Sequence, residues 1–494
     1  MDHDDSSILD AGIAEIARQV QRGDRSAEEV TLHAIDRIEQ GNARLGAFLT
    51  VQAEQALAEA RALDVRRARG ESLGRLAGVP IGLKDALCTK GVPTTAGSRI
   101  LTRGGGPGSG WLPPYDATVV SRLRNEGAIL VGKCNLDELA MGSSTENSAF
   151  FPAKNPWDED RTPGGSSGGS AVAVAARMTP GSLGSDTGGS IRQPAALTGV
   201  VGVKPTYGRV SRHGLIAFAS SLDQIGPFAA DVRGAARLLE VIAGHDPLDA
   251  TSLDAPVDAY EDACGQEVRG LRVGVPEEYF GQGIEPGVEA AVRAAIAKLE
   301  GLGCKVRPVT LPHTRLAVAA YYVIATAEAS SNLSRFDGVR FGLRVPGHDL
   351  ADLYESTRTE GFGREVKRRI ILGTYVLSAG YYDAYYLRAQ KVRTLIRRDF
   401  DEAFRDVDVL AAPVSPCVAF PLGARSEDPL SMYLADVDTL PASLAGVPAL
   451  SVPCGFATPF EGGPELPVGL QLIAPALEEA RLFAVAHAYE QARG

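Results

Sequence analysis

Two glycine–serine clusters on either side of one short apolar segment constrain this chain more than any other feature. They lie within residues 161–194, RTPGGSSGGSAVAVAARMTPGSLGSDTGGSIRQP. Because glycine loses more backbone entropy on ordering than any other residue, glycines this dense must bring a local gain. The gain that we expect is close approach of backbone N–H groups to a ligand, beside serine hydroxyls. The apolar residues 171–178 predict a helix that begins at 168–170 and directs its free N–H groups toward the serines.

A flexible linker is the simplest interpretation of a glycine–serine run. It does not account for the apolar helix predicted between the clusters, or for Asp186 and Arg192 next to the second cluster. A phosphate-binding loop does not fit either, because no lysine followed by serine or threonine comes after the glycines. We therefore expect an ordered segment with a different chemistry.

A serine nucleophile is one such chemistry. Residues 164–168 (GGSSG) match the Gly-x-Ser-x-Gly elbow of α/β-hydrolases, which would make Ser166 the nucleophile and a distant histidine its base. The match is short. No histidine lies between His33 and His213, and residues 157–163 before the motif are too polar for the strand that the elbow requires.

Lysine is the alternative base for a serine nucleophile. The apolar residues 76–83 (LAGVPIGL) predict a buried strand, and Lys84 stands at its end. A charged residue at the end of an apolar strand is more often an exposed strand terminus than a buried catalytic group, so this pattern alone does not identify Lys84 as a base. To act as a base near neutral pH, Lys84 needs its pKa lowered by roughly three units from about 10.4, and burial has this sign.

Three motifs together resemble the amidase signature family almost residue for residue. They are VPIGLKD at 79–85, PGGSSGGSAVAVA at 163–175 and the segment 184–227, which begins GSDTGGSIRQPAALTG. The resemblance implies a catalytic unit of Lys84 as the base, Ser166 as a bridging serine beside a cis peptide bond, and Ser190 as the nucleophile. It also implies an oxyanion hole made of four backbone N–H groups, those of Thr187, Gly188, Gly189 and Ser190.

The resemblance also bears on domain organisation. The length of 494 residues suggests about three domains, and 45% hydrophobic residues are ample for a large core. The family implies instead one large α/β/α domain, 1–494, with a mixed, largely parallel central sheet covered by helices. We expect N-terminal helices at 8–70, a signature core at 76–230, and a C-terminal part at 266–492 that completes the sheet and the substrate pocket. The turn-rich residues 240–265 are the one plausible internal boundary.

Local patterns predict individual elements. SAEE at 26–29 is a capping box that opens a helix to about residue 40, and YD at 115–116 is expected to cap a helix at 117–125 before a strand at 128–131. Residues 271–311 predict a β-α-β unit, with strands at 271–275 and 305–311 and a helix at 286–302. Amphipathic helices follow to about residue 404. Further strands and a last helix are expected at 407–414, 449–455, 467–474 and from 477.

Composition limits the function. A net charge of −11 argues against this chain being the main holder of a nucleic acid, which needs a basic surface. Six cysteines without a C-x-x-C pair predict free thiols in a reducing cytosol, and seven scattered histidines show no metal pattern. The apolar runs are too short for a transmembrane helix, and the acidic start MDHDDSS does not suit a secretion signal. We therefore expect a soluble, cytoplasmic protein.

Segments 321–342, 363–393 and 432–455 resemble one branch of the amidase signature family, the glutaminases that supply ammonia to tRNA-dependent amidotransferases. The resemblance implies that glutamine is hydrolysed through a glutamyl ester of Ser190. The ammonia would pass to a partner, the B subunit, which holds the misacylated Glu-tRNA(Gln) or Asp-tRNA(Asn) and activates its carboxylate with ATP and Mg²⁺. The small C subunit would complete a heterotrimer, and this chain would need no cofactor or metal of its own.

Selecting free glutamine requires a cation for its α-carboxylate and an anion for its α-ammonium group. The same resemblance places these at Arg369, in VKRRI, and at Asp436, before LPASLAG. From the residues alone, Arg369 more often belongs to a solvated helix face, whereas an unpaired Asp436 among apolar neighbours would be costly and favours a ligand or a salt bridge. The other substrate-binding residues that we expect are Tyr321, Gly142 and Ser143.

Two alternatives stay open. The chain could be a stand-alone amidase that acts on another carboxamide, or it could be catalytically inactive and serve only in assembly. Retention of Lys84, Ser166 and Ser190 together argues against the second.

Overall fold

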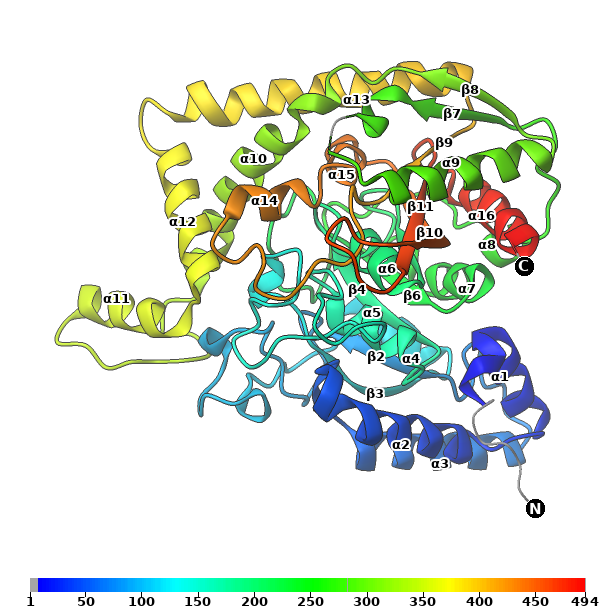
Figure 1. The fold of residues 1–494 in the computed structure, drawn as a ribbon. Coiled ribbons are helices and arrows are strands. Elements are labelled where there is room, and N and C mark those ends of the chain that lie inside the picture. The colour runs from blue at the N-terminus through cyan, green and yellow to red at the C-terminus, as the bar shows by residue number, and fades with distance from the viewer. Residues whose placement is uncertain (1–7, 282, 494) are drawn as a thin grey trace.

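The computed structural model describes residues 8–281 and 283–493, so the acidic segment MDHDDSS lies outside the described residues. Eleven strands of the described chain form one sheet in the order β1-β3-β2-β4-β6-β5-β10-β11-β9-β7-β8, with helices around it (Figure 1). The strands are β1 Phe48–Val51, β2 Pro80–Lys84, β3 Ile129–Cys134, β4 Gly181–Asp186, β5 Val201–Lys204, β6 Gln224–Ala229, β7 Arg272–Pro276, β8 Lys305–Val309, β9 Val409–Pro413, β10 Ala449–Ala457 and β11 Leu466–Ile473.

The α/β class with a mixed sheet is confirmed, but the expectation that the sheet is largely parallel is wrong. Four of the ten neighbouring strand pairs run parallel, namely β2–β3, β2–β4, β7–β8 and β7–β9. The other six pairs are antiparallel. Strands such as β9 and β11 are buried along their whole length. A strand buried on both faces is apolar whichever way its neighbours run, so its sequence does not reveal their direction.

The helices that the sequence patterns predict are present among the described residues, together with others that were not predicted individually. They are α1 Gly12–Arg22, α2 Ala27–Leu45, α3 Ala53–Ala68, α4 Thr118–Asn125, α5 Gly168–Ala175, α6 Arg192–Thr198, α7 Val232–Ile242, α8 Tyr260–Ala263, α9 Pro286–Gly301, α10 Ala317–Asn332, α11 Leu350–Gly361, α12 Arg364–Leu377, α13 Arg388–Asp406, α14 Pro429–Leu434, α15 Leu440–Ala445 and α16 Glu479–Arg493. None of them is both long enough and apolar enough to span a membrane.

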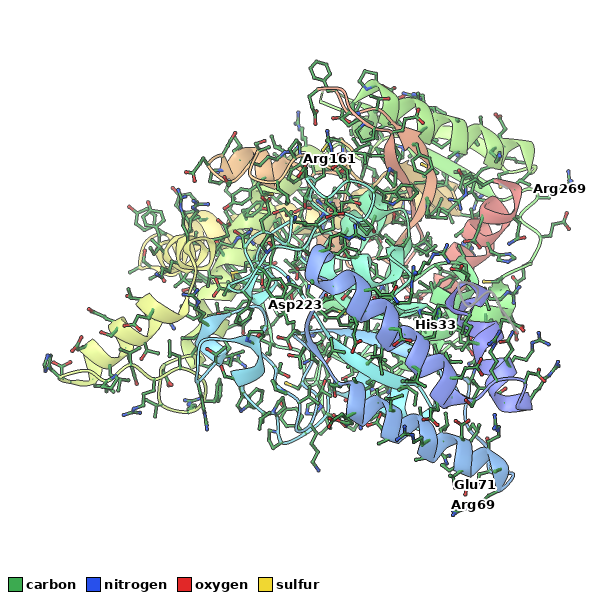
Figure 2. The ribbon with its side chains drawn as sticks, turned by 60° about the horizontal axis from the view of Figure 1, so that its bottom comes forward. His33, Arg69, Glu71, Arg161, Asp223 and Arg269 are labelled. Atoms are coloured by element: carbon green, nitrogen blue, oxygen red, sulfur yellow. The ribbon has the colours of Figure 1, made fainter. Side chains whose placement is uncertain are left out.

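The N-terminal helices cover the first strands of the sheet. Figure 2 shows α2, which carries His33, and α3 side by side in front of these strands. Ser26 Oγ accepts a hydrogen bond from the Glu29 N–H at 2.9 Å, so the predicted cap is confirmed. The helix runs past the predicted residue 40 to Leu45, where Gly46 ends it in a left-handed conformation with φ 64°.

The β-α-β unit is also confirmed. β7 and β8 are parallel neighbours, and α9 connects them with Pro286 in its first turn. The last three strands and the C-terminal helix lie within about two residues of their expected positions. β10 pairs with β5, so the C-terminal strands continue the sheet of the N-terminal half. Buried side chains of both halves form one hydrophobic core.

Two local expectations are wrong. Asp116 does not cap α4, because its Oδ1 instead accepts a hydrogen bond from the Lys90 N–H at 2.7 Å, and Ala117 starts the helix without a side-chain cap. The strand expected at 76–83 begins only at Pro80. Before it, the chain turns through Gly78, whose φ of +71° is incompatible with an extended strand.

Candidate active site

The carboxyl ends of β2 and β4 bring the two signature regions together. These strands are parallel neighbours, so Lys84 at the end of β2 lies at the same edge as Asp186 at the end of β4. Between them, α5 begins at Gly168, as predicted, and the peptide bond between Gly165 and Ser166 is cis. The serines that precede α5 therefore face Lys84.

Hydroxyl groups surround the amine of Lys84. Its Nζ lies 2.8 Å from Ser166 Oγ, 2.8 Å from Ser167 Oγ and 3.0 Å from Ser185 Oγ. The side chain is completely buried, and this burial lowers its pKa to about 7, although the more distant carboxylates of three aspartates raise it in part. Near neutral pH a substantial fraction of Lys84 is uncharged and can accept a proton from Ser166.

Ser190 lies next to this pair in the turn after β4. Its carbonyl accepts a hydrogen bond from the Ser167 N–H at 3.2 Å, which holds the turn against the start of α5. Ser190 remains 8% exposed, and its hydroxyl forms no hydrogen bond with any residue that the structure describes. The structure thus brings Lys84 and Ser166 into contact, and a backbone hydrogen bond holds the turn of Ser190 against the same segment.

A buried ion pair closes the turn between Asp186 and Arg192. Arg192 Nε lies 3.0 Å from Asp186 Oδ2, its Nη2 lies 3.0 Å from Oδ1, and both side chains have no exposed surface. Burial alone would raise the pKa of Asp186, but the arginine holds it below the ordinary value. Arg192 Nη1 also donates to Thr439 O at 2.9 Å and to Gln471 Oε1 at 2.8 Å. The turn is therefore tied to the C-terminal part of the chain.

The two glycines of this turn have no room for a side chain. A Cβ at Gly188 would lie 2.7 Å from the ring of Tyr321, and one at Gly189, where φ is +150°, would lie 2.2 Å from Thr439 Oγ1. The backbone N–H groups of residues 187–190 donate to no residue that the structure describes. Thr187 Oγ1 donates to Asp223 Oδ1 at 2.7 Å, and the side chain of Asp223 is buried.

Asp137 shapes the serine-rich loop that follows it. Its carboxylate accepts hydrogen bonds from the N–H groups of Ser144, Thr145 and Asn147 at 2.8–3.3 Å. A Cβ at Gly142 would lie 2.4 Å from Asp137 Cγ, so only glycine fits there. These contacts fix the path of the loop, although the sequence predicts only a turn.

Asp436 carries a carboxylate oxygen without a partner. Ser143 Oγ donates to its Oδ2, whereas its Oδ1 is buried and has no hydrogen bond among the described residues. Burial raises the pKa of Asp436 to about 7, an effect that Ser143 and Arg369 partly oppose. A buried carboxylate oxygen without a hydrogen bond lowers the stability of the fold unless a ligand binds it.

Arg369 is buried, although the residue pattern alone favours a solvated helix face. Only 3% of it is exposed, and its Nε contacts Glu365 Oε1 at 2.8 Å. Its guanidinium lies 5.5 Å from each of three aromatic ring centres, those of Phe218, Tyr322 and Tyr433. The structure therefore brings a buried cation and a buried carboxylate into the same region as the turn that holds Ser190.

Three functional residues were not recognised from the sequence. Asp137, Asp223 and Thr439 fix the loop and the turn of the site, yet each is an ordinary polar residue in its own segment. Their roles depend on contacts across distant parts of the chain. No cluster of ligands suited to a metal ion occurs in residues 8–281 and 283–493.

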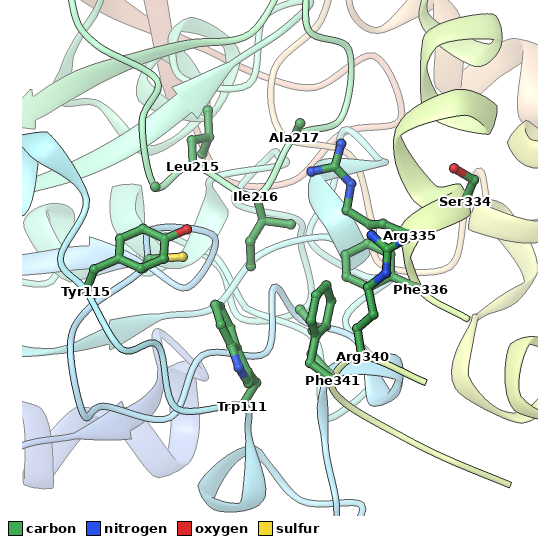
Figure 3. A pocket seen from close by; sticks show the side chains of 13 residues that line it. Trp111, Tyr115, Leu215, Ile216, Ala217, Ser334, Arg335, Phe336, Arg340 and Phe341 are labelled. Carbon is green, nitrogen blue, oxygen red and sulfur yellow. The ribbon is translucent and has the colours of Figure 1, made fainter. Parts of the chain in front are cut away.

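A separate cavity of about 730 Å³ is lined in part by residues 214–217, which directly precede Phe218 in the chain (Figure 3). Aromatic and apolar side chains line it, among them Trp111, Tyr115, Ile216 and Phe341, together with Arg335. None of the predicted site residues lines this cavity. The volume of this cavity therefore does not make it the candidate active site.

The family model described as Amidase matches residues 29–483 of the chain. The chain belongs to the amidase family. Among curated amidase relatives, the A subunit of glutamyl-tRNA(Gln) amidotransferase of Moorella thermoacetica is 61% identical over 97% of this chain and 95% of that protein.

Solved structures of the amidase family have the same fold. The crystal structure of the A subunit of glutamyl-tRNA(Gln) amidotransferase from Thermotoga maritima is 42% identical, with a TM-score of 0.79 over 99% of this chain and 96% of that one. Peptide amidase from Stenotrophomonas maltophilia is 32% identical, with a TM-score of 0.79 over 97% and 96% of the two chains. An amidotransferase subunit and a peptide amidase thus share the fold of this chain.

The Asp186–Arg192 pair gives a stability prediction. Replacing Arg192 with Leu leaves a fully buried carboxylate without its partner, so the free energy of unfolding should fall by about 3–5 kcal/mol. Chemical denaturation followed by circular dichroism measures this change.

The matched control is Arg272→Leu, because Arg272 forms an ion pair with Asp408 at 2.8 Å but is 42% exposed. This change should cost no more than about 1 kcal/mol. Equal losses in the two variants would contradict a special role for the buried pair.

Proposed function

We propose that this chain is the glutaminase component, the A subunit, of a tRNA-dependent amidotransferase and that it hydrolyses glutamine to supply ammonia. The observation that carries the proposal is the contact of the buried Lys84, whose pKa is lowered to about 7, with Ser166, close to the turn that holds Ser190. The high identity to relatives named as the A subunit of such an amidotransferase favours this function over that of a stand-alone amidase.

Ser190 is the proposed nucleophile. Its Oγ attacks the carboxamide carbon of glutamine while its proton passes to Ser166, and Ser166 gives its own proton to neutral Lys84. The N–H groups of residues 187–190, which have no protein acceptor among the described residues, suit the stabilisation of the oxyanion that forms. When the tetrahedral intermediate collapses, the proton returns from Lys84 through Ser166 to the departing nitrogen, and ammonia leaves. Water then hydrolyses the glutamyl ester by the same relay.

Arg369 and Asp436 are the proposed ligands of the glutamine zwitterion. The guanidinium of Arg369 attracts the α-carboxylate, and the unpartnered Oδ1 of Asp436 accepts a hydrogen bond from the α-ammonium group. Ser143 orients Asp436 by donating to its other oxygen. Tyr321 packs against Gly188 and Gly142 permits the loop to approach Asp137, so both shape the pocket that holds the substrate.

The remaining steps belong to partner proteins in this proposal. The B subunit would hold the misacylated tRNA and activate its carboxylate with ATP and Mg²⁺, and the small C subunit would complete a cytoplasmic heterotrimer. The net charge of −11 supports this division, because the surface of a chain that only supplies ammonia need not attract RNA.

Replacing Ser190 with Ala tests the nucleophile. Because the glutamyl ester needs this oxygen, the Ser190→Ala variant should lose glutamine hydrolysis. In the assembled heterotrimer, amidation of misacylated tRNA from added ammonium should persist, because free ammonia bypasses the glutaminase site. Both activities are measured on the same preparation, and loss of both would show that Ser190 is structural. A wild-type chain that hydrolyses amides but never supports tRNA amidation would instead be a stand-alone amidase.

Charge removal tests substrate selection. Arg369→Ala and Asp436→Asn each leave one charge of glutamine unpaired, which costs roughly 2–5 kcal/mol and should lower kcat/KM for glutamine accordingly. The loss should be much smaller for a neutral aliphatic amide, which lacks both charges. Equal losses on the two substrates would mean that these residues support the fold and do not select glutamine.

A further inference from the structure

Two neighbouring residues, Asp137 and Glu138, direct buried carboxylates toward different parts of the proposed glutamine site. Asp137 orders the serine-rich loop that follows it. Glu138 is 2% exposed, and its carboxylate accepts two hydrogen bonds but forms no ion pair with any residue that the structure describes. Burial of a carboxylate without a cationic partner is costly. The two hydrogen bonds therefore indicate a role for Glu138 beyond filling space.

Glu138 holds the start of α12. Its Oε2 accepts a hydrogen bond from the Gly363 N–H at 2.8 Å, and its Oε1 accepts one from Ser98 Oγ. Gly363 directly precedes α12 and has no side chain with which to cap the helix. The helix α11 projects from the molecule and leads into this same end of α12 (Figure 1). Glu138 thus ties the junction of the two helices to the signature core.

The position of α12 determines the position of Arg369. This residue lies in the second turn of the helix, and Glu365 in the first turn contacts its Nε at 2.8 Å. Because both partners of this ion pair belong to α12, a shift of the helix carries the guanidinium with it. Beyond Arg369, a Cβ at Gly373 would lie 1.9 Å from Thr326 O of α10, so the two helices are in close contact there. The helix is therefore held on both sides of Arg369.

Asp137 fixes the other proposed ligand of glutamine. Its carboxylate accepts a hydrogen bond from the Thr145 N–H at 2.8 Å, and Ser143 in the same loop donates to Asp436. The N–H of Asp137 donates to the Ser166 carbonyl at 3.2 Å. One dipeptide, itself bonded to the segment of Ser166, thus holds the supports of both Arg369 and Asp436.

The backbone directly after the dipeptide adopts an unfavourable conformation. Leu139 has φ +51° and Ala140 has φ +61°, a left-handed region that residues other than glycine seldom adopt. Both residues are buried. Conformations of this kind persist only where the surrounding structure enforces them, and they gather at functional sites. The shape of this turn therefore matters to the site that it supports.

We propose that Glu138 is a positioning residue for substrate selection: by fixing the start of α12, it sets the place of Arg369 relative to Asp436 and so favours an amide that carries a carboxylate. This inference rests on the proposed function, in which Arg369 binds the α-carboxylate of glutamine. Glu138 acts through Arg369 and takes no part in breaking the amide bond. Hydrolysis of an amide without a carboxylate should consequently not depend on Glu138.

Three substrates separate this role from a general contribution to the fold. They are glutamine, 4-carbamoylbutanoate, which lacks the α-ammonium group, and 4-aminobutanamide, which lacks the α-carboxylate. In the full-length chain assembled with the B and C subunits, Glu138→Ala should lower kcat/KM for the first two by about 10–100-fold, mainly through KM. A displacement of a binding group by about 1 Å is sufficient for such a loss. Hydrolysis of 4-aminobutanamide should not change.

Two further variants alter the same contact. Glu138→Gln keeps an acceptor for the Gly363 N–H, so its kcat/KM for glutamine should stay within about threefold of the wild-type value. Gly363→Ala should reproduce the pattern of Glu138→Ala, because the new Cβ would lie 2.4 Å from Glu138 Oε2 while the φ of −71° suits alanine. This variant decides the question even if Glu138→Ala does not fold.

The matched control is Glu490→Ala. Glu490 Oε1 accepts a hydrogen bond from the Val232 N–H at 3.0 Å, at the start of α7, a helix that carries none of the proposed site residues. Removing this contact should leave kcat/KM unchanged for all three substrates. A double-mutant cycle gives a second readout. In the Arg369→Ala background, Glu138→Ala should lower glutamine hydrolysis by less than about twofold, because both changes remove the same interaction.

Each outcome decides the inference. It is wrong if Glu138→Ala and Gly363→Ala lower kcat/KM equally for all three substrates, if they leave glutamine hydrolysis unchanged, or if the loss multiplies with that of Arg369→Ala. It is also wrong if Glu138→Gln is as impaired as Glu138→Ala. In these cases the proposed function stands, provided that the wild-type complex prefers glutamine to 4-aminobutanamide. A wild-type complex without that preference would contradict the proposed function and this inference together.

Discussion

The burial of one amine among hydroxyl groups is the interaction on which the rest of the site depends. Lys84 has no exposed surface, and its nearest polar neighbours are three serine oxygens and no carboxylate. Lys133 is equally buried but lies 3.0 Å from Asp85 Oδ1, which is the usual way to stabilise a buried ammonium. Without such a partner the neutral form of Lys84 is favoured. In the proposed mechanism, this unpaired buried amine is the base.

Holding this arrangement requires contacts from the whole chain. Lys84 comes from β2 and the serines from the start of α5 and from β4, whereas Arg192 anchors the turn of Ser190 to Thr439 and Gln471 in the C-terminal part. The same C-terminal part supplies Asp436. One continuous sheet therefore brings the proposed catalytic residues and the proposed glutamine ligands together.

The sequence predicted those features that depend on local chemistry. The start of α5 at Gly168 and the cap at Ser26 follow from the glycine clusters and a capping box. The strand pattern alone favours an exposed Lys84, and its burial was expected only from the catalytic role that the family resemblance implies. Features set by distant contacts were missed. The direction of the strands depends on pairing across the sheet, the burial of Arg369 depends on three aromatic rings from other segments, and the role of Asp137 depends on the loop folding back onto it.

The most direct test of this account is the pH dependence of acylation at Ser190, measured with a neutral ester that needs neither Arg369 nor Asp436. The rate should rise as Lys84 loses its proton, with an apparent pKa of about 7, and should then reach a plateau. Because burial also raises the pKa of Asp436 to about 7, the profile should be recorded in the Asp436→Asn variant as well, where the same inflection is expected. A rate that is independent of pH between about 6 and 9, or one that rises only near the ordinary lysine pKa of about 10.4, would contradict a neutral Lys84 as the base.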